Sequence, residues 1–424
     1  MDELPQIETA ADIEMSGPVR DDLAARVMVV VVISLVVAMA VVFSWFNRRL
    51  LIPDARNWER GLLVTRTFDP PTNKVELFHN QGDGQFFAHM AQDPFLSRPD
   101  RIRGGTSEQA YRLQRPMFGW LGWAASGGDA GRAAWSIIYV TVASVGLLAG
   151  AVAMAAARMG RSPLWGLAVL AAPGVHVDLL RSGPEVLGAA LVTAALVVMA
   201  PAWRSAPWGV DRSRLSDSRL WVAVVLFALA GLTRESFLVV PFVLAGVWLW
   251  QSRSRTAPDE SSEDHAIGIW RSWAWPLASV VPFLIWVVVL RIAVGAWPVG
   301  AGPEFTGERM ASFPLGGLVD GIGDWRRGEV VSFLLVSIPA GLGLLRSRSP
   351  ELRALILVHV ALAATFGQIV WVTWVGFGRV LLPLSVISLL AILDRREADG
   401  ADRGIKEASR PMRAAWLKRG EASA

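Results

Sequence analysis

Residues 26–46 read RVMVVVVISLVVAMAVVFSWF, an almost unbroken apolar run that decides the fold of this chain. A helix rises 1.5 Å per residue, so a run of this length covers about 30 Å, the thickness of the hydrocarbon core of a bilayer. The residues before it are predominantly polar, and the run is too long for the apolar part of a signal peptide. We therefore interpret it as a first membrane span that is not cleaved.

The composition extends this interpretation to the whole chain. Of its 424 residues 53% are hydrophobic, and the mean hydropathy is +0.40, as is typical of a protein with many spans. Cysteine is absent, which excludes disulfides, thiolate metal sites and cysteine nucleophiles. Twenty tryptophans against two tyrosines fit an aromatic belt at the membrane surfaces. The net charge of +4 and the arginine-rich loops indicate anionic lipid headgroups as partners, and we expect no nucleic acid.

Nine further apolar segments predict an all-α, polytopic integral membrane bundle of about ten transmembrane helices. Two of the segments have only about 15 residues each, which is short for a full span, so a count of nine is left open. The nine segments are residues 133–157, 163–178, 184–201, 219–233, 236–250, 273–293, 329–346, 354–373 and 380–393.

The pattern divides the chain into five parts. The loop between the first two spans is too long for a simple connection, so we expect a small folded domain there. In it, Phe86, Phe87 and Met90 have the spacing of a helix that lies flat on the membrane. The parts are an N-terminal tail (1–25), the first span (26–46), the loop domain (47–132), the helix bundle (133–393) and a basic tail (394–424).

The distribution of arginine predicts which side each loop faces. Four short loops hold twelve arginines in all, whereas the short loops on the opposite side hold one each. Because arginine-rich loops stay in the cytoplasm, both termini are predicted to be cytoplasmic and the loop domain extracytoplasmic. Arg48 and Arg49, directly after the first span, favour the opposite orientation. The arginine-rich loops are residues 158–162, 202–219, 251–272 and 346–353.

With this topology, the charged residues in or beside the spans collect on the predicted outer face. Ionisable groups at membrane depth usually face a cavity or one another. Arginine matches phosphate oxygens with two parallel hydrogen bonds, and a carboxylate beside it suits activation of an acceptor hydroxyl. The pattern therefore indicates a site for a lipid phosphate. The residues concerned are Asp83, Asp93, Arg112, Arg115, Asp178, Arg181, Glu185, Arg234, Glu235, Arg309 and Arg379.

Each of these residues also has a purely structural interpretation. Asp83, flanked by two glycines, suits a turn, and Asp93 before Pro94 suits the end of a helix. Arg234 and Glu235 suit an ion pair at the apex of a hairpin. The five histidines show no spacing typical of a metal site, so we expect no histidine-based one. Arg181, Glu185 and Arg379 suit helix ends, where charged residues cap the helix or extend to the membrane surface.

Several motifs resemble a bacterial family of polytopic membrane glycosyltransferases of the GT-C type, also described as cell-surface glycopolymer formation proteins. The resemblance extends distantly to the GPI mannosyltransferases, and it covers the order of elements over residues 25–395. Gly82 stands where that family has an aromatic residue. The motifs are Gly82-Asp83-Gly84-Gln85-Phe86-Phe87, Asp93-Pro94, Ala110-Tyr111-Arg112-Leu113-Gln114-Arg115-Pro116, Leu232-Thr233-Arg234-Glu235 and Gly378-Arg379-Val380-Leu381-Leu382-Pro383.

The resemblance implies a fold, a reaction and roles for individual residues. The fold is a GT-C helix bundle in the bacterial plasma membrane, with catalysis on the extracytoplasmic side. The enzyme takes a sugar from a polyprenyl-phosphate donor and passes it to a cell-envelope acceptor. Asp83 is the implied catalytic acid–base, while Arg112, Arg115 and Arg234 contact the donor phosphate and Glu235 orients Arg234. The other implied substrate-binding residues are Gly84, Gln85, Asp93, Arg181, Glu185 and Arg379.

Cofactor and mechanism remain open at this level. No cofactor is required by the sequence, and the resemblance allows a divalent cation such as Mg or Mn. Two other functions stay open: a carrier or flippase for a lipid-linked sugar, which would use the same arginines, and a non-catalytic scaffold in envelope assembly. A transporter typically has two pseudo-symmetric halves with interrupted helices in matching positions, and no such repeat is evident in the sequence.

Overall fold

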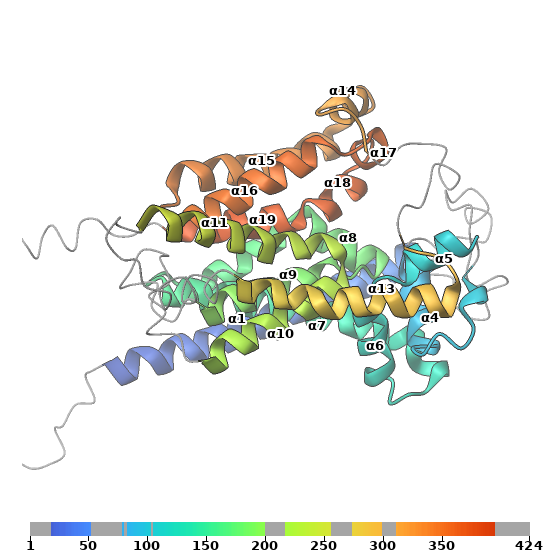
Figure 1. Ribbon diagram of the computed structural model, residues 1–424. Coiled ribbons are helices and arrows are strands. Elements are labelled where there is room, and N and C mark those ends of the chain that lie inside the picture. The colour runs from blue at the N-terminus through green and yellow to red at the C-terminus, as the bar shows by residue number, and fades with distance from the viewer. Residues whose placement is uncertain are drawn as a thin grey trace, which may run out of the picture.

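The apolar segments fold as helices, which pack into one elongated bundle (Figure 1). No β-strand occurs in the part of the chain that the structure describes, where one isolated bridge joins Ala311 and Phe366. The predicted all-α class is therefore confirmed for this part. The structure is a computed structural model, and it describes residues 18–51, 79, 83–102, 105–199, 217–255, 274–298 and 311–394.

Twenty helices make up the described chain, four of them short 3₁₀ helices (η). In chain order they are α1 (Pro18–Leu51), α4 (Gly84–Gln92), η1 (Pro99–Arg101), α5 (Thr106–Leu113), α6 (Pro116–Ala125), α7 (Ala130–Arg158), η2 (Pro163–Ala171), α8 (Pro173–Arg181), α9 (Glu185–Met199), α10 (Asp217–Thr233), η4 (Glu235–Leu238), α11 (Val239–Arg255), η5 (Trp275–Val280), α13 (Val281–Val294), α14 (Gly316–Ile322), α15 (Arg327–Arg346), α16 (Pro350–Ala364), α17 (Gln368–Trp371), α18 (Trp374–Val380) and α19 (Leu382–Leu393).

The length and composition of the described helices indicate a membrane protein. Four segments are long and apolar enough to cross a bilayer, and the number rises to six if each of two bent pairs counts as one span. The pairs are η2 with α8, bent by 67°, and α18 with α19, bent by 55°. Helices α9, α10 and α11 are apolar but shorter, so the predicted ten spans are not confirmed. The four segments are Leu23–Trp45, Ala130–Arg158, Trp275–Val294 and Arg327–Arg346.

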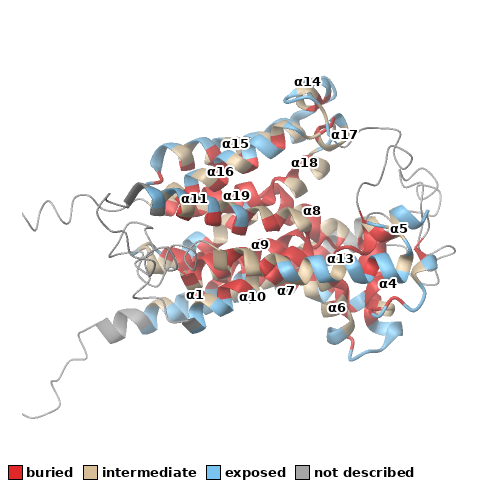
Figure 2. Ribbon diagram, in the orientation of Figure 1, coloured by how far each residue is buried: buried red, intermediate tan, exposed pale blue. Residues whose placement is uncertain are grey.

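Several of these helices, among them α1, α13 and α15, are exposed along the outside of the bundle (Figure 2). Large side chains such as Val31 on α1, Ile285 on α13 and Leu334 on α15 are exposed. Exposed apolar surface of this extent is costly in water and is the surface that lipid covers. The finding supports a bilayer as the partner of these helices.

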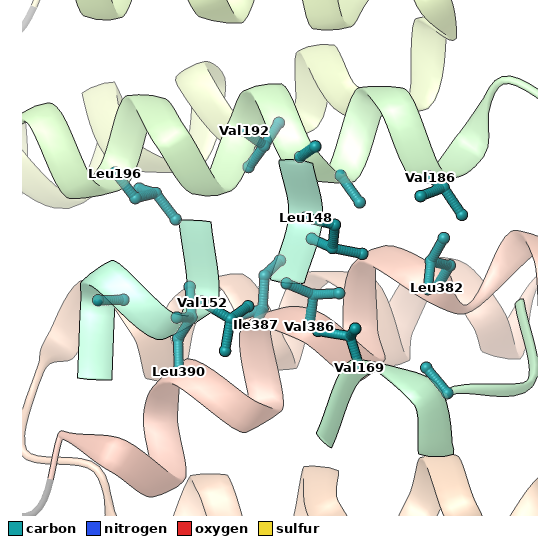
Figure 3. Packing of buried hydrophobic residues seen from close by; sticks show 14 of the residues in the cluster. Leu148, Val152, Val169, Val186, Val192, Leu196, Leu382, Val386, Ile387 and Leu390 are labelled. Carbon is teal, nitrogen blue, oxygen red and sulfur yellow. The ribbon is translucent and has the colours of Figure 1, made fainter. Parts of the chain in front are cut away.

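Helices α7, α9 and α19 form the centre of the bundle (Figure 3). Branched side chains such as Leu148, Val192 and Ile387 interdigitate there and are at most 4% exposed. Small residues bring the neighbouring helices close: a Cβ on Gly150 of α7 would stand 2.7 Å from the Cδ1 atom of Ile33 on α1. Close packing through small residues is typical of helices in membranes.

The loop domain differs from the prediction in one respect. Residues 84–92 do form a helix, α4, but it is not a helix lying flat on a membrane. Phe86, Phe87 and Met90 are at most 2% exposed and pack against α6 and α7. Gly119 of α6 permits this contact, since a Cβ there would stand 2.5 Å from the Cβ of Met90. The apolar face of α4 thus joins a protein core instead of lipid.

Several predicted features lie outside the described residues, namely Gly82, Arg309, much of the loop domain (52–78, 80–82 and 103–104), the first 17 residues and the basic tail after Asp394. Helix α1 begins earlier than predicted, at Pro18 instead of Arg26. The described chain begins and ends at the same end of the bundle, opposite α4 and α5 (Figure 1). The side of a membrane on which each terminus lies stays a prediction.

Candidate functional site

Charged side chains from five parts of the chain meet at the end of the bundle that carries α4 and α5 (Figure 1). We call this group the arginine cluster. Each member belongs to the loop domain or to a helix end, so the polar groups gather where the apolar helices stop. Its members are Asp83, Arg112, Arg115, Arg181, Glu185, Arg234, Glu235 and Arg379.

Asp83 bridges two arginines that are far apart in sequence. It directly precedes α4, and Arg112 lies in the last turn of α5, where its Nη1 donates to Asp83 Oδ1 over 3.1 Å. Arg379 of α18 donates from Nη1 to the other carboxylate oxygen, Oδ2, over 2.5 Å. The Arg112 guanidinium also lies 4.4 Å from the ring centre of Phe86, which fixes its position. Asp83 therefore ties the loop domain to the C-terminal helices.

Glu185 holds a second pair of arginines. It is the first residue of α9, and its Oε1 pairs with Nη1 of Arg234, which lies between α10 and η4. The same oxygen is 3.1 Å from Nε of Arg379, an ion pair that lacks hydrogen-bond geometry. Asp178 of α8 accepts a hydrogen bond from the Val186 amide over 2.6 Å and so fixes the start of α9. Arg379 is thus shared by Asp83 and Glu185.

Two buried carboxylate oxygens beside these pairs have no partner among the described residues. They are Oδ1 of Asp178 and Oε2 of Glu185, and both side chains are at most 2% exposed. A Cβ on Gly183 would collide with both carboxylates. Glycine at this position therefore leaves room for the two acids, and the cluster holds more acceptor capacity than its internal pairs use.

The third pair is Arg115 with Glu235. Arg115 directly precedes α6, and its Nε and Nη2 donate to the two carboxylate oxygens of Glu235 over 2.8 and 2.6 Å. Arg115 Nη2 also donates to the hydroxyl of Tyr111 over 3.2 Å. Two parallel hydrogen bonds hold a guanidinium in a fixed plane. Because Glu235 is 33% exposed, this pair lies at the open edge of the cluster.

The electrostatic environment keeps Asp83 ionised. Burial raises the pKa of its carboxyl, but Arg379 and Arg112 outweigh this effect and hold the pKa well below its ordinary value. Arg181, at the end of α8, lies within electrostatic range of Asp83 as well. A carboxylate stabilised in this way is a weak base. It becomes a stronger one only when guanidinium groups leave it.

Among the described residues, three other predicted site residues take no part in the ion pairs of this cluster. Gly84, which the resemblance implies as a substrate-binding residue, has protein as its neighbour, since a Cβ there would stand 2.6 Å from the carbonyl oxygen of Arg181. Gln85 is fully buried. Asp93 accepts hydrogen bonds from the Ser97 amide and hydroxyl and the Arg98 amide over 2.9, 2.6 and 2.7 Å. It closes the turn after α4, in agreement with its structural interpretation.

Tyr111 belongs to one of the sequence motifs, but no role was predicted for it. Its position was informative, because it precedes Arg112 directly and lies four residues before Arg115 on or next to the same helix. Glu108, 3.9 Å from Nε of Arg112, was also missed. Both residues could have been found from the sequence, because each lies one helical turn from an arginine of the predicted site.

The donor set does not suit a metal ion at Asp83. Both of its oxygens face guanidinium groups, an arrangement that repels a cation and favours an anion. Among the described residues, no group of three or more His, Asp or Glu side chains is placed to hold a metal. The divalent cation that the family resemblance allows stays a prediction.

Comparisons of the chain with family models, with curated proteins and with solved structures find no match. The resemblance of its motifs to the GT-C type therefore stays a prediction. The arrangement itself is a group of five guanidinium groups, three of them deeply buried, around carboxylates at the end of an apolar bundle.

Proposed function

We propose that the protein is a membrane glycosyltransferase of the GT-C type. It transfers a sugar from a polyprenyl-phosphate donor to a glycan, lipid or protein acceptor on the extracytoplasmic side of a bacterial plasma membrane. The observation that carries the proposal is the ionised Asp83 between the guanidinium groups of Arg112 and Arg379. A carboxylate and a phosphate present similar pairs of oxygens to arginine, so this arrangement suits a phosphate as well.

The first step is the exchange of one anion for another. The donor phosphate enters at the partly exposed edge, where Arg379 is 24% and Glu235 is 33% exposed. It takes over hydrogen bonds that Arg112 and Arg379 otherwise give to Asp83. The polyprenyl chain extends along the apolar outside of the bundle, which lipid already covers. Asp83 then loses the positive charges that lower its basicity.

The second step is displacement at the anomeric carbon of the sugar. The acceptor hydroxyl oxygen forms a bond to this carbon, and the bond from the carbon to the phosphate oxygen breaks. The electron pair of that bond stays on the polyprenyl phosphate, whose growing negative charge the guanidinium groups stabilise. The proton of the acceptor hydroxyl passes to the carboxylate of Asp83. Because donor binding frees this carboxylate, the donor binds before the acceptor reacts.

The test is sugar transfer by the purified protein in liposomes that contain a radiolabelled polyprenyl-phosphate sugar. We expect Asp83→Asn to lower the transfer rate by about a hundredfold or more, the usual effect of losing a general base. Asp93→Asn removes the same charge from the same loop domain outside the cluster and serves as the matched control. Equal rates for Asp83→Asn and wild type would refute the proposal.

The same liposomes distinguish the other two functions. A carrier would move labelled lipid between the leaflets without transferring sugar. A scaffold would do neither, and it would tolerate Asp83→Asn in an assay of envelope assembly. Either result in the wild type would replace the glycosyltransferase proposal.

A further inference from the structure

The hydroxyl of Tyr111 occupies a special position in the arginine cluster. Tyr111 lies in α5, and its ring centre is 5.1 Å from the guanidinium carbon of Arg115 and 5.6 Å from that of Arg112. Its oxygen accepts a hydrogen bond from Arg115 Nη2 over 3.2 Å. The ring therefore lies near the guanidinium groups of two arginines, and its hydroxyl is held by one of them, Arg115.

The hydrogen of this hydroxyl is available for a ligand. A tyrosine hydroxyl both accepts and donates. In Tyr111 the oxygen accepts from Arg115, while the hydrogen meets no acceptor among the described residues. The side chain is half-buried. A polar hydrogen in such a position usually finds a partner, which here has to come from outside the described chain.

The surroundings determine what kind of acceptor fits. The guanidinium groups of Arg112 and Arg115 beside the ring favour an anionic oxygen over a neutral one. Glu235, which shares Arg115 with Tyr111, is 33% exposed, so the hydroxyl lies near the open edge of the cluster. A phosphate monoester or diester anion fits these surroundings, because it has several oxygens that take hydrogen bonds from arginine and tyrosine at once.

We infer that Tyr111 donates a hydrogen bond to a phosphate oxygen of the lipid-linked ligand, in a phosphate site that it forms together with Arg115. This inference rests on the proposed function and adds a binding residue to it. Arg115 fixes the hydroxyl oxygen, so the hydrogen is directed away from Arg115 and toward the ligand. The hydroxyl contributes both to binding of the donor and to stabilisation of the leaving phosphate.

The chain offers a matched control, because it contains only two tyrosines. Tyr139 of α7 is 64% exposed on the outside of the bundle. Tyr111→Phe keeps the ring beside the arginines and removes only the hydroxyl, and Tyr139→Phe makes the same change elsewhere. We expect Tyr111→Phe to raise the Kd for farnesyl phosphate about tenfold, the usual effect of losing a hydrogen bond to a charged group. The Tyr139→Phe protein and the uncharged analogue farnesol show no such change.

Carbon-13 NMR of the protein labelled at tyrosine Cζ observes the hydroxyl directly. Two signals are expected, and each is assigned by its disappearance in one of the two Phe variants. Farnesyl phosphate should shift the Tyr111 signal and leave the Tyr139 signal in place, whereas farnesol should shift neither. A role in packing alone would lower the thermal stability of Tyr111→Phe without distinguishing farnesyl phosphate from farnesol.

The outcomes separate this inference from the proposed function. Suppose that wild type transfers sugar and binds farnesyl phosphate, but the ligand does not shift the Tyr111 signal and Tyr111→Phe has the Kd of the wild type. The inference is then wrong and the function stands. If wild type neither binds the phosphate nor transfers sugar, both fail.

Discussion

Replacing Asp83 with asparagine should change phosphate binding and sugar transfer in opposite directions. In the wild type, a phosphate competes with the Asp83 carboxylate for Arg112 and Arg379, whose Nη1 atoms lie 3.1 and 2.5 Å from its two oxygens. Asparagine has nearly the same shape but no charge, so both guanidinium groups lose an anionic partner, although Arg379 keeps its contact with Glu185. The protein should then bind a phosphate more tightly and still lack the base that transfer requires.

The structure sets the size of this effect. A hydrogen bond to a charged group contributes about 1.5–3 kcal/mol. The side chains of Asp83 and Arg379 are 16% and 24% exposed, so solvent screens the pair and the lower limit applies. Loss of the competing carboxylate should therefore favour phosphate binding by about 1.5 kcal/mol, which corresponds to a Kd about tenfold lower.

Titration of the detergent-solubilised protein with farnesyl phosphate, followed by tryptophan fluorescence, measures this Kd. Asp93→Asn is the control, because among the described residues the Asp93 carboxylate accepts hydrogen bonds from Ser97 and Arg98 and from no arginine side chain. Its Kd should equal that of the wild type. An Asp83→Asn protein that binds farnesyl phosphate as weakly as the wild type, or more weakly, would show that carboxylate and phosphate do not compete for these arginines.

Three further predictions follow from the same geometry. Burial raises the pKa of the Asp83 carboxyl, but the paired guanidinium groups outweigh burial and hold this pKa below the ordinary 3.8. The stability that the pairing contributes is therefore fully present above pH 3.8, and it is lost only as the pH falls through the lower pKa of the folded state. The difference in apparent Tm between wild type and Asp83→Asn should therefore stay constant over roughly pH 5–8 and shrink in stronger acid; a difference that vanishes near neutral pH would contradict the pairing. Gly84→Ala places a Cβ 2.6 Å from a backbone carbonyl of α8, so it should destabilise the protein by about 1–3 kcal/mol and lower its apparent Tm. Gly246→Ala is the control, because a Cβ there meets nothing within 4 Å and should leave the Tm unchanged. Equal Tm values for the two variants would show that α4 and α8 do not pack so closely. Because the chain has no cysteine, single introduced cysteines report the orientation of the protein in the membrane. A membrane-impermeant maleimide should label Phe95→Cys in intact cells, and it should label Leu345→Cys, at the opposite end of the bundle, only after lysis. The reverse pattern would place the arginine cluster in the cytoplasm.

The helices could be predicted because long apolar runs have few alternatives. The segment expected at 133–157 is α7, Ala130–Arg158, and its ends lie close to those predicted. Breaks within apolar runs were harder to predict. The segment expected at 354–373 ends as α16 at Ala364 and continues as the separate short helix α17 after Gly367, which precedes its first turn in extended conformation. A hydropathy profile averages over many residues and therefore does not show such a break. The break itself depends on the backbone conformation of a few residues.

The burial of α4 shows a second limit. Helical spacing of Phe86, Phe87 and Met90 predicts an apolar face, and that face exists. The spacing is the same for a helix on a membrane and for one against a protein core, so it cannot identify the covering surface. The close contact that decides between them comes from Gly119, about thirty residues further along the chain.

The candidate site was predictable in its members but not in its pairing. Charge at membrane depth is costly enough that Arg112, Arg234 and Arg379 were expected to face partners. The sequence could not show that Glu185 rather than Glu235 pairs with Arg234, or that Asp83 joins Arg112 to Arg379. Those pairings depend on how α5, α9 and α18 pack together, which no local motif encodes.

The most direct test of the central claim is a structure of the protein in lipid nanodiscs with farnesyl phosphate, determined by electron cryo-microscopy. The phosphate should lie within hydrogen-bond distance of Arg112 or Arg379, with at least one of them released from Asp83. A phosphate bound elsewhere, with Asp83 still joined to both arginines, would contradict the claim.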